Sequence, residues 1–181
     1  SDVMDVRQNT SLRQGDASQI NQLVNDLNSG KVKGVIIAGV NPAYTLPNAD
    51  AFIAGLKKAD LSLSFSLKND ETAVHCQWVA PSPHYLESWG DYEFKPGHFS
   101  LSQPTIRPLF DTQQFQDILL RLAGKNSKFY DEIKAHWNES ILGTSSWSKT
   151  LHDGYFSGET SKEFSTPDFT GLNPIGLREA S

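Results

Sequence analysis

The stretch GVIIAGVNPAYTLPNAD, from Gly34 to Asp50, joins a short apolar run to a turn and then to the start of a helix. The run VIIA is rich in β-branched residues, which is typical of a strand buried on both faces. Pro42 and Pro47 restrict the backbone of the turn that follows. In open α/β sheets, ligands bind beyond the carboxyl ends of the strands, so this turn is a candidate binding loop.

Helices and strands alternate around this stretch. A helix is predicted after the N-cap residue Asp16, with Ile20, Leu23, Val24 and Leu27 at helical spacing, and a second helix is predicted from Asp50 to Lys58. The run ADLSLSFSL predicts a half-buried strand, because one face is apolar and the other is small and polar. NDETAV predicts a short helix capped by Asn69 or Asp70, and HCQWVAP predicts a further strand. We therefore expect an α/β fold, with a Rossmann-like, doubly wound, mostly parallel sheet and helices on both faces.

The second half of the chain has a different pattern. From Ser82 to Pro108 it is aromatic and interrupted by prolines, and we interpret it as a long loop that packs over a sheet or against a partner domain. Three helices are expected next: one capped by Asp111, one from Ser127 to about Glu139, and a short one ended by Gly154. The predicted divisions are a lead-in (1–15), an α/β domain (16–124), a C-terminal helical extension of that domain (125–156) and an irregular tail (157–181).

Composition and charge exclude several classes of partner. The chain has 16 Lys and Arg against 21 Asp and Glu and contains no basic run, so we expect no nucleic-acid partner. No apolar segment approaches the length that crosses a bilayer, so a soluble segment without direct membrane insertion is expected. A single cysteine, Cys76, excludes an internal disulfide and a cysteine-rich cluster site within these residues. The chain does not begin with Met, and we expect it to be a piece of a longer polypeptide.

The residues with catalytic or metal-binding chemistry form no recognised motif. The five histidines show no HxH or HExxH spacing, so no metal site and no catalytic residue are assigned. His75 and Cys76 are adjacent and would point to opposite faces of the predicted strand. Cys76 is interpreted as a small core residue. The alternative of a thiol nucleophile, assisted by His75 or His84 and Asp91, stays open.

Four short motifs lie at or near the predicted strand ends: GVNP at 39–42, ETA at 71–73, VAP at 79–81 and ESWG at 87–90, of which VAP ends the strand HCQWVAP. In this order they resemble a cofactor-holding α/β domain of the molybdopterin oxidoreductases, over roughly Asp16 to Gly154. HYLESWGD, QPTIRPLF and the later Trp147 to Gly154 pattern most resemble one branch of that family. This branch is the molybdopterin-like/iron–sulfur subunit of the quinol-oxidising respiratory alternative complex III.

The resemblance implies a function and a site. In active members such a domain helps to bind molybdopterin guanine dinucleotide, which implies a cofactor-binding mouth formed by Gly39, Asn41, Pro42, Glu71, Thr72 and Glu87. The alternative complex III branch implies a scaffold without molybdenum cofactor, whose iron–sulfur clusters lie elsewhere in the subunit. Two departures favour the scaffold: the bulky Trp78 replaces a family strand pattern, and PGHFSLSQP stands where the family has a cationic N-x-x-G-R element.

The expected function is thus a non-catalytic scaffold domain of an iron–sulfur oxidoreductase subunit in a quinol-oxidising electron-transfer complex. The alternative is a molybdopterin guanine dinucleotide-binding domain of an active molybdoenzyme. The resemblance also implies partners, namely other domains of the parent subunit and further subunits of a membrane complex. It implies a location at the periplasmic face of a bacterial inner membrane.

Overall fold

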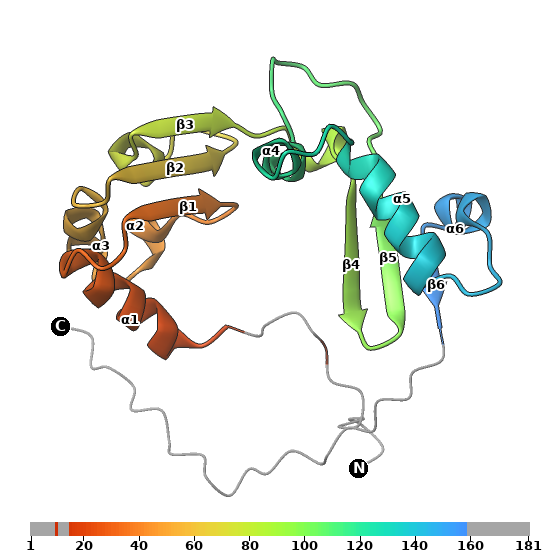
Figure 1. Ribbon diagram of the computed structural model, residues 1–181, viewed down its shortest axis with the longest axis horizontal. Helices are drawn as coiled ribbons and strands as arrows, with labels where there is room; N and C mark the ends of the chain where they lie inside the picture. The colour runs from red at the N-terminus through yellow and green to blue at the C-terminus, as the bar shows by residue number, and fades with distance from the viewer. Residues whose placement is uncertain (1–9, 11–14, 159–181) are drawn as a thin grey trace, which may run out of the picture.

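Two three-stranded sheets organise the described part of the chain, which comprises residue 10 and residues 15–158 in the computed structural model (Figure 1). The first sheet is parallel, with the order β1-β2-β3, and the second is antiparallel, with the order β4-β5-β6. The strands are β1 (Gly34–Ala38), β2 (Leu61–Ser66), β3 (Trp78–Pro81), β4 (Gly90–Lys95), β5 (His98–Ser102) and β6 (Tyr155–Ser157). A mixed α/β fold is confirmed, whereas the antiparallel sheet differs from the single, mostly parallel sheet that was predicted.

The helices of the first unit begin and end close to the predicted residues. They are α1 (Ala17–Asn28), α2 (Pro42–Thr45), α3 (Ala49–Leu56) and the 3₁₀ helix η1 (Ala73–His75). Asp16 caps α1 as predicted, because its carboxylate accepts the Ser18 N–H at 2.8 Å. The short helix α2 was not predicted. Proline suits its first position, where a backbone N–H would have no helical partner.

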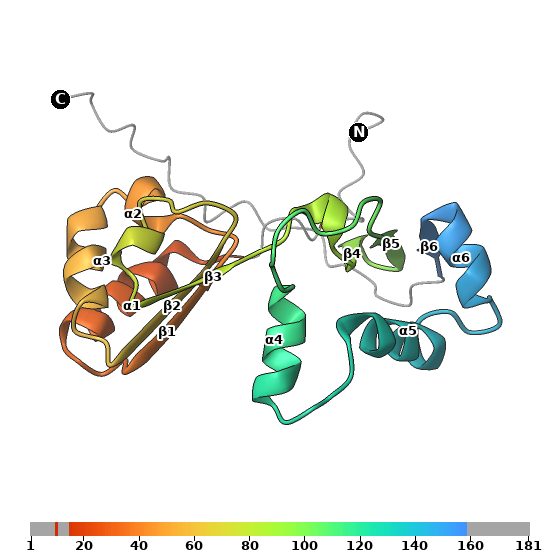
Figure 2. The same cartoon turned by 90° about the horizontal axis from the view of Figure 1, so that it is seen from above.

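The first core lies between the sheet and its helices. Val35 and Ile37 of β1 point to one face, which α1 and α3 cover with Val24, Leu27, Phe52 and Leu56. Figure 2 shows α1, α2 and α3 together on this side of the sheet. The two longer helices approach closely at Gly55, where a Cβ atom would lie 2.8 Å from the Cβ of Leu27. Glycine is therefore required for this helix contact.

The two faces of strand β2 differ in burial, and the buried face is not the one that hydrophobicity would suggest. Ser62 and Ser64, on the small polar face, are buried under the helices. Leu61 and Leu63, on the apolar face, are exposed and partly exposed. On that face Phe65 is buried, because Phe115 of α4 (Phe115–Leu122) packs on it with ring centroids 4.7 Å apart. The small serines allow the helices to lie close to the sheet, and the larger residues face away from them.

The predicted loop from Ser82 to Pro108 is wrong over much of its length, because it contains a β-hairpin. β4 and β5 pair in antiparallel fashion, and Gly97, with φ of 76°, occupies the turn between them. A register shift between Glu93 and Lys95 accommodates the extra residue of a bulge. Strand β6, which begins in the segment expected to be a helical extension, then pairs with β5. Residues 159–181 of the predicted tail lie outside the described residues.

The second core lies between this hairpin and the last two helices, α5 (Phe129–Ser140) and α6 (Trp147–Asp153). Trp137 is fully buried at its centre, and its indole N–H donates to the Asp91 carboxylate at 2.8 Å. Gly154 ends α6 as predicted, with φ of 77°. The prediction that Asp111 caps α4 is wrong, since Gln114 is the N-cap. Among the described residues, no helix is long and apolar enough to span a membrane.

Candidate functional site

Two strand-end loops meet at the carboxyl edge of the first sheet, as parallel strands predict. The loop after β1 carries Asn41, and the loop after β2 carries Glu71 and Thr72. The Asn41 amide N–H donates to the Glu71 carboxylate at 2.7 Å, and the Thr72 hydroxyl donates to the Asn41 amide oxygen at 2.7 Å. The same hydroxyl accepts the Ala43 N–H at 2.9 Å. We call these four residues the loop network.

Local sequence explains how each loop is held. Gly39 ends β1 with φ of 66°, a left-handed conformation that glycine adopts without strain, and its N–H donates to the Phe65 carbonyl. In the second loop the Asp70 carboxylate accepts the N–H groups of Thr72 and Ala73 at 3.1 and 2.8 Å, although the N-cap of η1 is Thr72 and not the predicted Asn69 or Asp70. These two hydrogen bonds hold the backbone at Thr72, whose side chain is fully buried.

The network is anionic. The hydrogen bond from Asn41 lowers the pKa of Glu71, so its carboxylate is ionised at neutral pH. Among the ion pairs between described residues, none involves Glu71. Phosphate groups bind to N–H donors and cations. Here the Ala43 N–H already donates to Thr72 and the Asn41 amide to a carboxylate, so these residues do not fit the phosphates of a dinucleotide.

Glu87 belongs to a different set of contacts from the other predicted site residues. It lies in the 3₁₀ helix η2 (Tyr85–Glu87) after β3, and its carboxylate accepts the N–H groups of His84 at 3.1 Å and Leu109 at 3.2 Å. The first contact completes a capping box. Glu87 therefore fixes the chain that leads to the hairpin, and the structure gives it no hydrogen bond to Asn41, Glu71 or Thr72.

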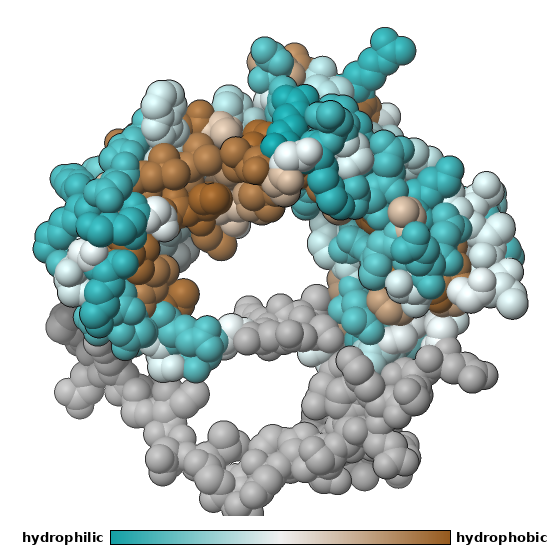
Figure 3. All heavy atoms as spheres, in the orientation of Figure 1, coloured by the Kyte–Doolittle hydropathy of each residue, from teal (hydrophilic) through white to brown (hydrophobic). Residues whose placement is uncertain are grey.

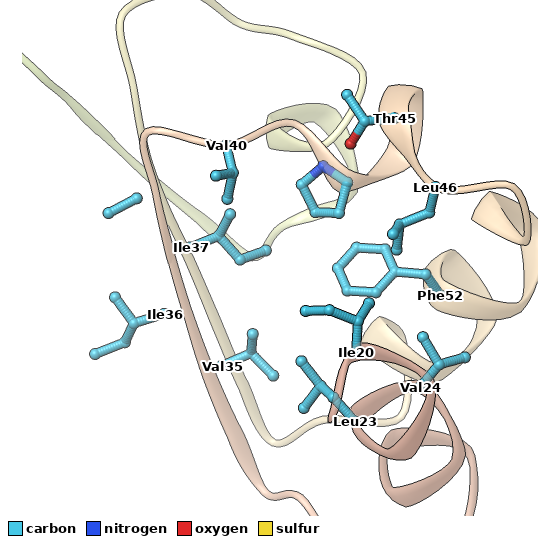
Figure 4. Close-up of a pocket in the computed structure, with 12 residues that line it drawn as sticks. Ile20, Leu23, Val24, Val35, Ile36, Ile37, Val40, Thr45, Leu46 and Phe52 are labelled. Atoms are coloured by element: carbon cyan, nitrogen blue, oxygen red, sulfur yellow. The ribbon is translucent and has the colours of Figure 1, made fainter. Parts of the chain in front are cut away.

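An apolar groove of about 480 Å³ lies beside β1, near the loop network. Of the predicted site residues, only Pro42 lines it. Figure 4 shows side chains from α1, β1, α2 and α3 around this space, which we call the β1 groove; its lining includes Ile20, Leu23, Val35, Ile37, Val40, Leu46 and Phe52. Ile20 belongs to the apolar stripe of α1 that the sequence shows, and its 43% exposure at the groove is seen only in the structure.

The structure supports neither a metal site nor a cysteine nucleophile among the described residues. Within residues 15–158 as described, no group of three or more His, Cys, Asp or Glu residues could hold a metal ion. The expectation that His75 and Cys76 lie on a strand is wrong, because His75 ends η1 and Cys76 is its C-cap. Burial, with a smaller contribution from the Asp70 carboxylate, raises the pKa of the Cys76 thiol. A protonated, partly buried thiol does not support the nucleophile alternative.

Comparison with known proteins confirms the resemblance to molybdopterin oxidoreductases. The chain is 36% identical over 120 residues to a menaquinone reductase, molybdopterin-binding-like subunit, from Nitratidesulfovibrio vulgaris, covering 59% of this chain and 17% of that protein. It is 26% identical over 153 residues to the formate dehydrogenase 2 subunit alpha of the same organism, covering 72% of this chain and 15% of that protein.

A solved structure shares the fold. Acetylene hydratase from Pelobacter acetylenicus superposes with a TM-score of 0.62 at 18% identity, covering 77% of this chain and 20% of that one. No family model matches the sequence. The chain thus spans about a fifth or less of the length of these proteins.

Proposed function

We propose that this chain is a non-catalytic scaffold domain of a molybdopterin oxidoreductase-like, iron–sulfur-containing subunit of a quinol-oxidising respiratory complex. In this proposal the domain holds neighbouring parts of the subunit in place and binds no molybdenum cofactor. The first sheet is one half of a Rossmann-like, doubly wound sheet. Partners are the other domains of the subunit and further subunits of a membrane complex at the periplasmic face of a bacterial inner membrane.

The closed loop network is the observation that carries this proposal. In a dinucleotide site, polar groups at the strand ends must be free to face the ligand. In this chain Asn41, Thr72 and Glu71 satisfy one another at 2.7 Å, and the ionised Glu71 would repel phosphate. The similarity to a subunit named molybdopterin-binding-like, rather than to a catalytic subunit alone, supports the same conclusion.

A second candidate function is supported by the similarity to a formate dehydrogenase alpha subunit. In that case the domain binds one pterin guanine dinucleotide of an active molybdoenzyme, and Gly39, Asn41, Pro42, Thr72 and Glu71 surround it. Cofactor binding would then require the network to open, because its donors are engaged in this structure.

Metal and pterin analysis of the longer protein separates the two candidates. Purified protein is assayed for iron, molybdenum and pterin per subunit; the scaffold predicts iron with far less than one molybdenum. One molybdenum and its pterin per subunit would refute the scaffold. In that event Asn41→Asp, which places a second carboxylate against Glu71, should release pterin, while Asn69→Asp, an exposed change in the neighbouring loop, should not.

A further inference from the structure

The first sheet has one face that the described chain leaves largely open. Ile36, Leu63 and Trp78 lie side by side across the three strands on this face, and Leu61 extends the row. The exposed fractions are 47% for Ile36, 44% for Leu61 and 65% for Trp78. Figure 3 shows hydrophobic residues gathered over β1 and β2. We call these four residues the open face.

One edge of the same sheet is also unpaired. Within the described residues, β1 pairs with β2 alone. The Lys33 carbonyl and the Gly39 N–H both bond toward β2, so by alternation the backbone groups of Gly34, Ile36 and Ala38 point to the free edge. β1 has none of the features that protect edge strands, such as a charge, a proline or a bulge. Its free edge is therefore competent to pair with another strand.

Two physical rules connect the open face with the free edge. All-parallel sheets are stable when both faces are covered, and here α1 and α3 cover only one. Right-handed crossovers to β2 and β3 keep their connections on that face. A parallel strand on the other side of β1 would be reached by a crossover over the opposite face, as in doubly wound sheets. A single strand–helix unit would thus complete both surfaces.

We propose that the β1 edge binds a parallel β-strand and that the open face binds the amphipathic helix joined to it. This inference rests on the proposed function, in that both segments come from polypeptide of the same subunit beyond residues 1–181. Such polypeptide is abundant in the similar proteins, of which this chain spans 15 to 20%. Apolar side chains of the added strand enter the β1 groove, which is lined by α1, β1 and α2.

Amide hydrogen exchange at single-residue resolution tests this pairing. In the monomeric 181-residue chain, the amides of Ile36 and Ala38 should exchange quickly, and those of Val35 and Ile37 slowly. In the longer protein, the Ile36 and Ala38 amides should slow by at least about tenfold, because a new strand accepts their hydrogen bonds. Light scattering in parallel reports whether the shorter chain is a monomer.

A substitution pair adds a matched control. Ile36→Asp places a charge on the open face and should abolish the slowing in the longer protein, whereas Val74→Asp changes a residue of similar exposure, 56%, outside the first sheet and should preserve it. Three results would refute the proposed occupant. The Ile36 and Ala38 amides could exchange quickly in both proteins, they could already exchange slowly in the monomer, or they could be slowed by dimerisation of the 181-residue chain. Stoichiometric molybdenum together with the slowing would refute the scaffold and leave the docking intact.

Discussion

The loop network makes a specific prediction at Thr72, the one fully buried member. Its side chain has 0% exposure, and its hydroxyl accepts from Ala43 and donates to Asn41. Thr72→Val keeps the shape of the side chain and removes only the hydroxyl. The change therefore creates no cavity, and its effect on the free energy of unfolding reports the two hydrogen bonds.

The expected cost follows from the groups that lose their partners. A buried donor or acceptor left unsatisfied costs about 1–3 kcal/mol. The Ala43 N–H and the Asn41 amide oxygen are only partly buried, so water recovers part of that cost. We expect a net loss of about 2 kcal/mol, which lowers the melting temperature by about 8–16 °C for a folding unit of 60–100 residues.

Urea unfolding of the 181-residue chain, followed by far-ultraviolet circular dichroism, measures this loss. Asn41→Ala removes the amide that links the loops, so a double-mutant cycle with Thr72→Val should show a coupling of about 0.5–3 kcal/mol. Thr72→Ser retains the hydroxyl, so a cycle that combines it with Asn41→Ala should show little coupling. Additive effects of Thr72→Val and Asn41→Ala, or a Thr72→Val variant as stable as the parent chain, would show that the loops are not held together by this network.

Two further predictions concern helix packing and acid stability. Gly55→Ala should lower the free energy of unfolding by about 1–2 kcal/mol in the same urea assay. The new methyl group would lie 2.8 Å from the Leu27 Cβ, and this overpacking outweighs the gain in helix propensity. A variant of equal or higher stability would contradict the tight contact. The pKa of Glu71 is lowered from 4.5 in the folded chain, so its contribution is present above that pH and is lost as the pH falls through the folded pKa. Unfolding midpoints measured from pH 7 to pH 3 should therefore fall less steeply in Asn41→Ala than in the parent chain, and equal slopes would rule out the Asn41 contact as the cause.

Sequence patterns predicted the elements whose signals are local. The N-cap Asp16 and the terminating Gly154 are decided within one helical turn, and both predictions are confirmed. The hairpin was missed because nearby prolines outweighed its signal. That signal is nevertheless in the sequence: Pro96-Gly97 separates two short runs in which apolar and polar residues alternate, which is typical of a hairpin.

The candidate site was predictable in position and not in detail. Parallel strands place their following loops at one edge, which is enough to bring Asn41 near Thr72. Whether the two side chains face a ligand or each other depends on their χ angles, which do not follow from residue spacing. Glu87 shows the limit of the same rule, since the turn after β3 directs its carboxylate to the backbone N–H groups of His84 and Leu109.

The alternation in β2 shows what a pattern cannot decide alone. Leu and Ser alternate regularly, and by hydrophobicity the leucine face should be the buried one. The chain instead buries Ser62 and Ser64, because the handedness of the crossovers fixes the side of the sheet on which the helices lie. Phe115 covers Phe65 on the leucine face, and in our proposal the added strand–helix unit covers the rest. Covering the exposed Leu61, Ile36 and Trp78 would remove apolar area from water at about 25 cal/mol per Å², which favours docking of such a unit.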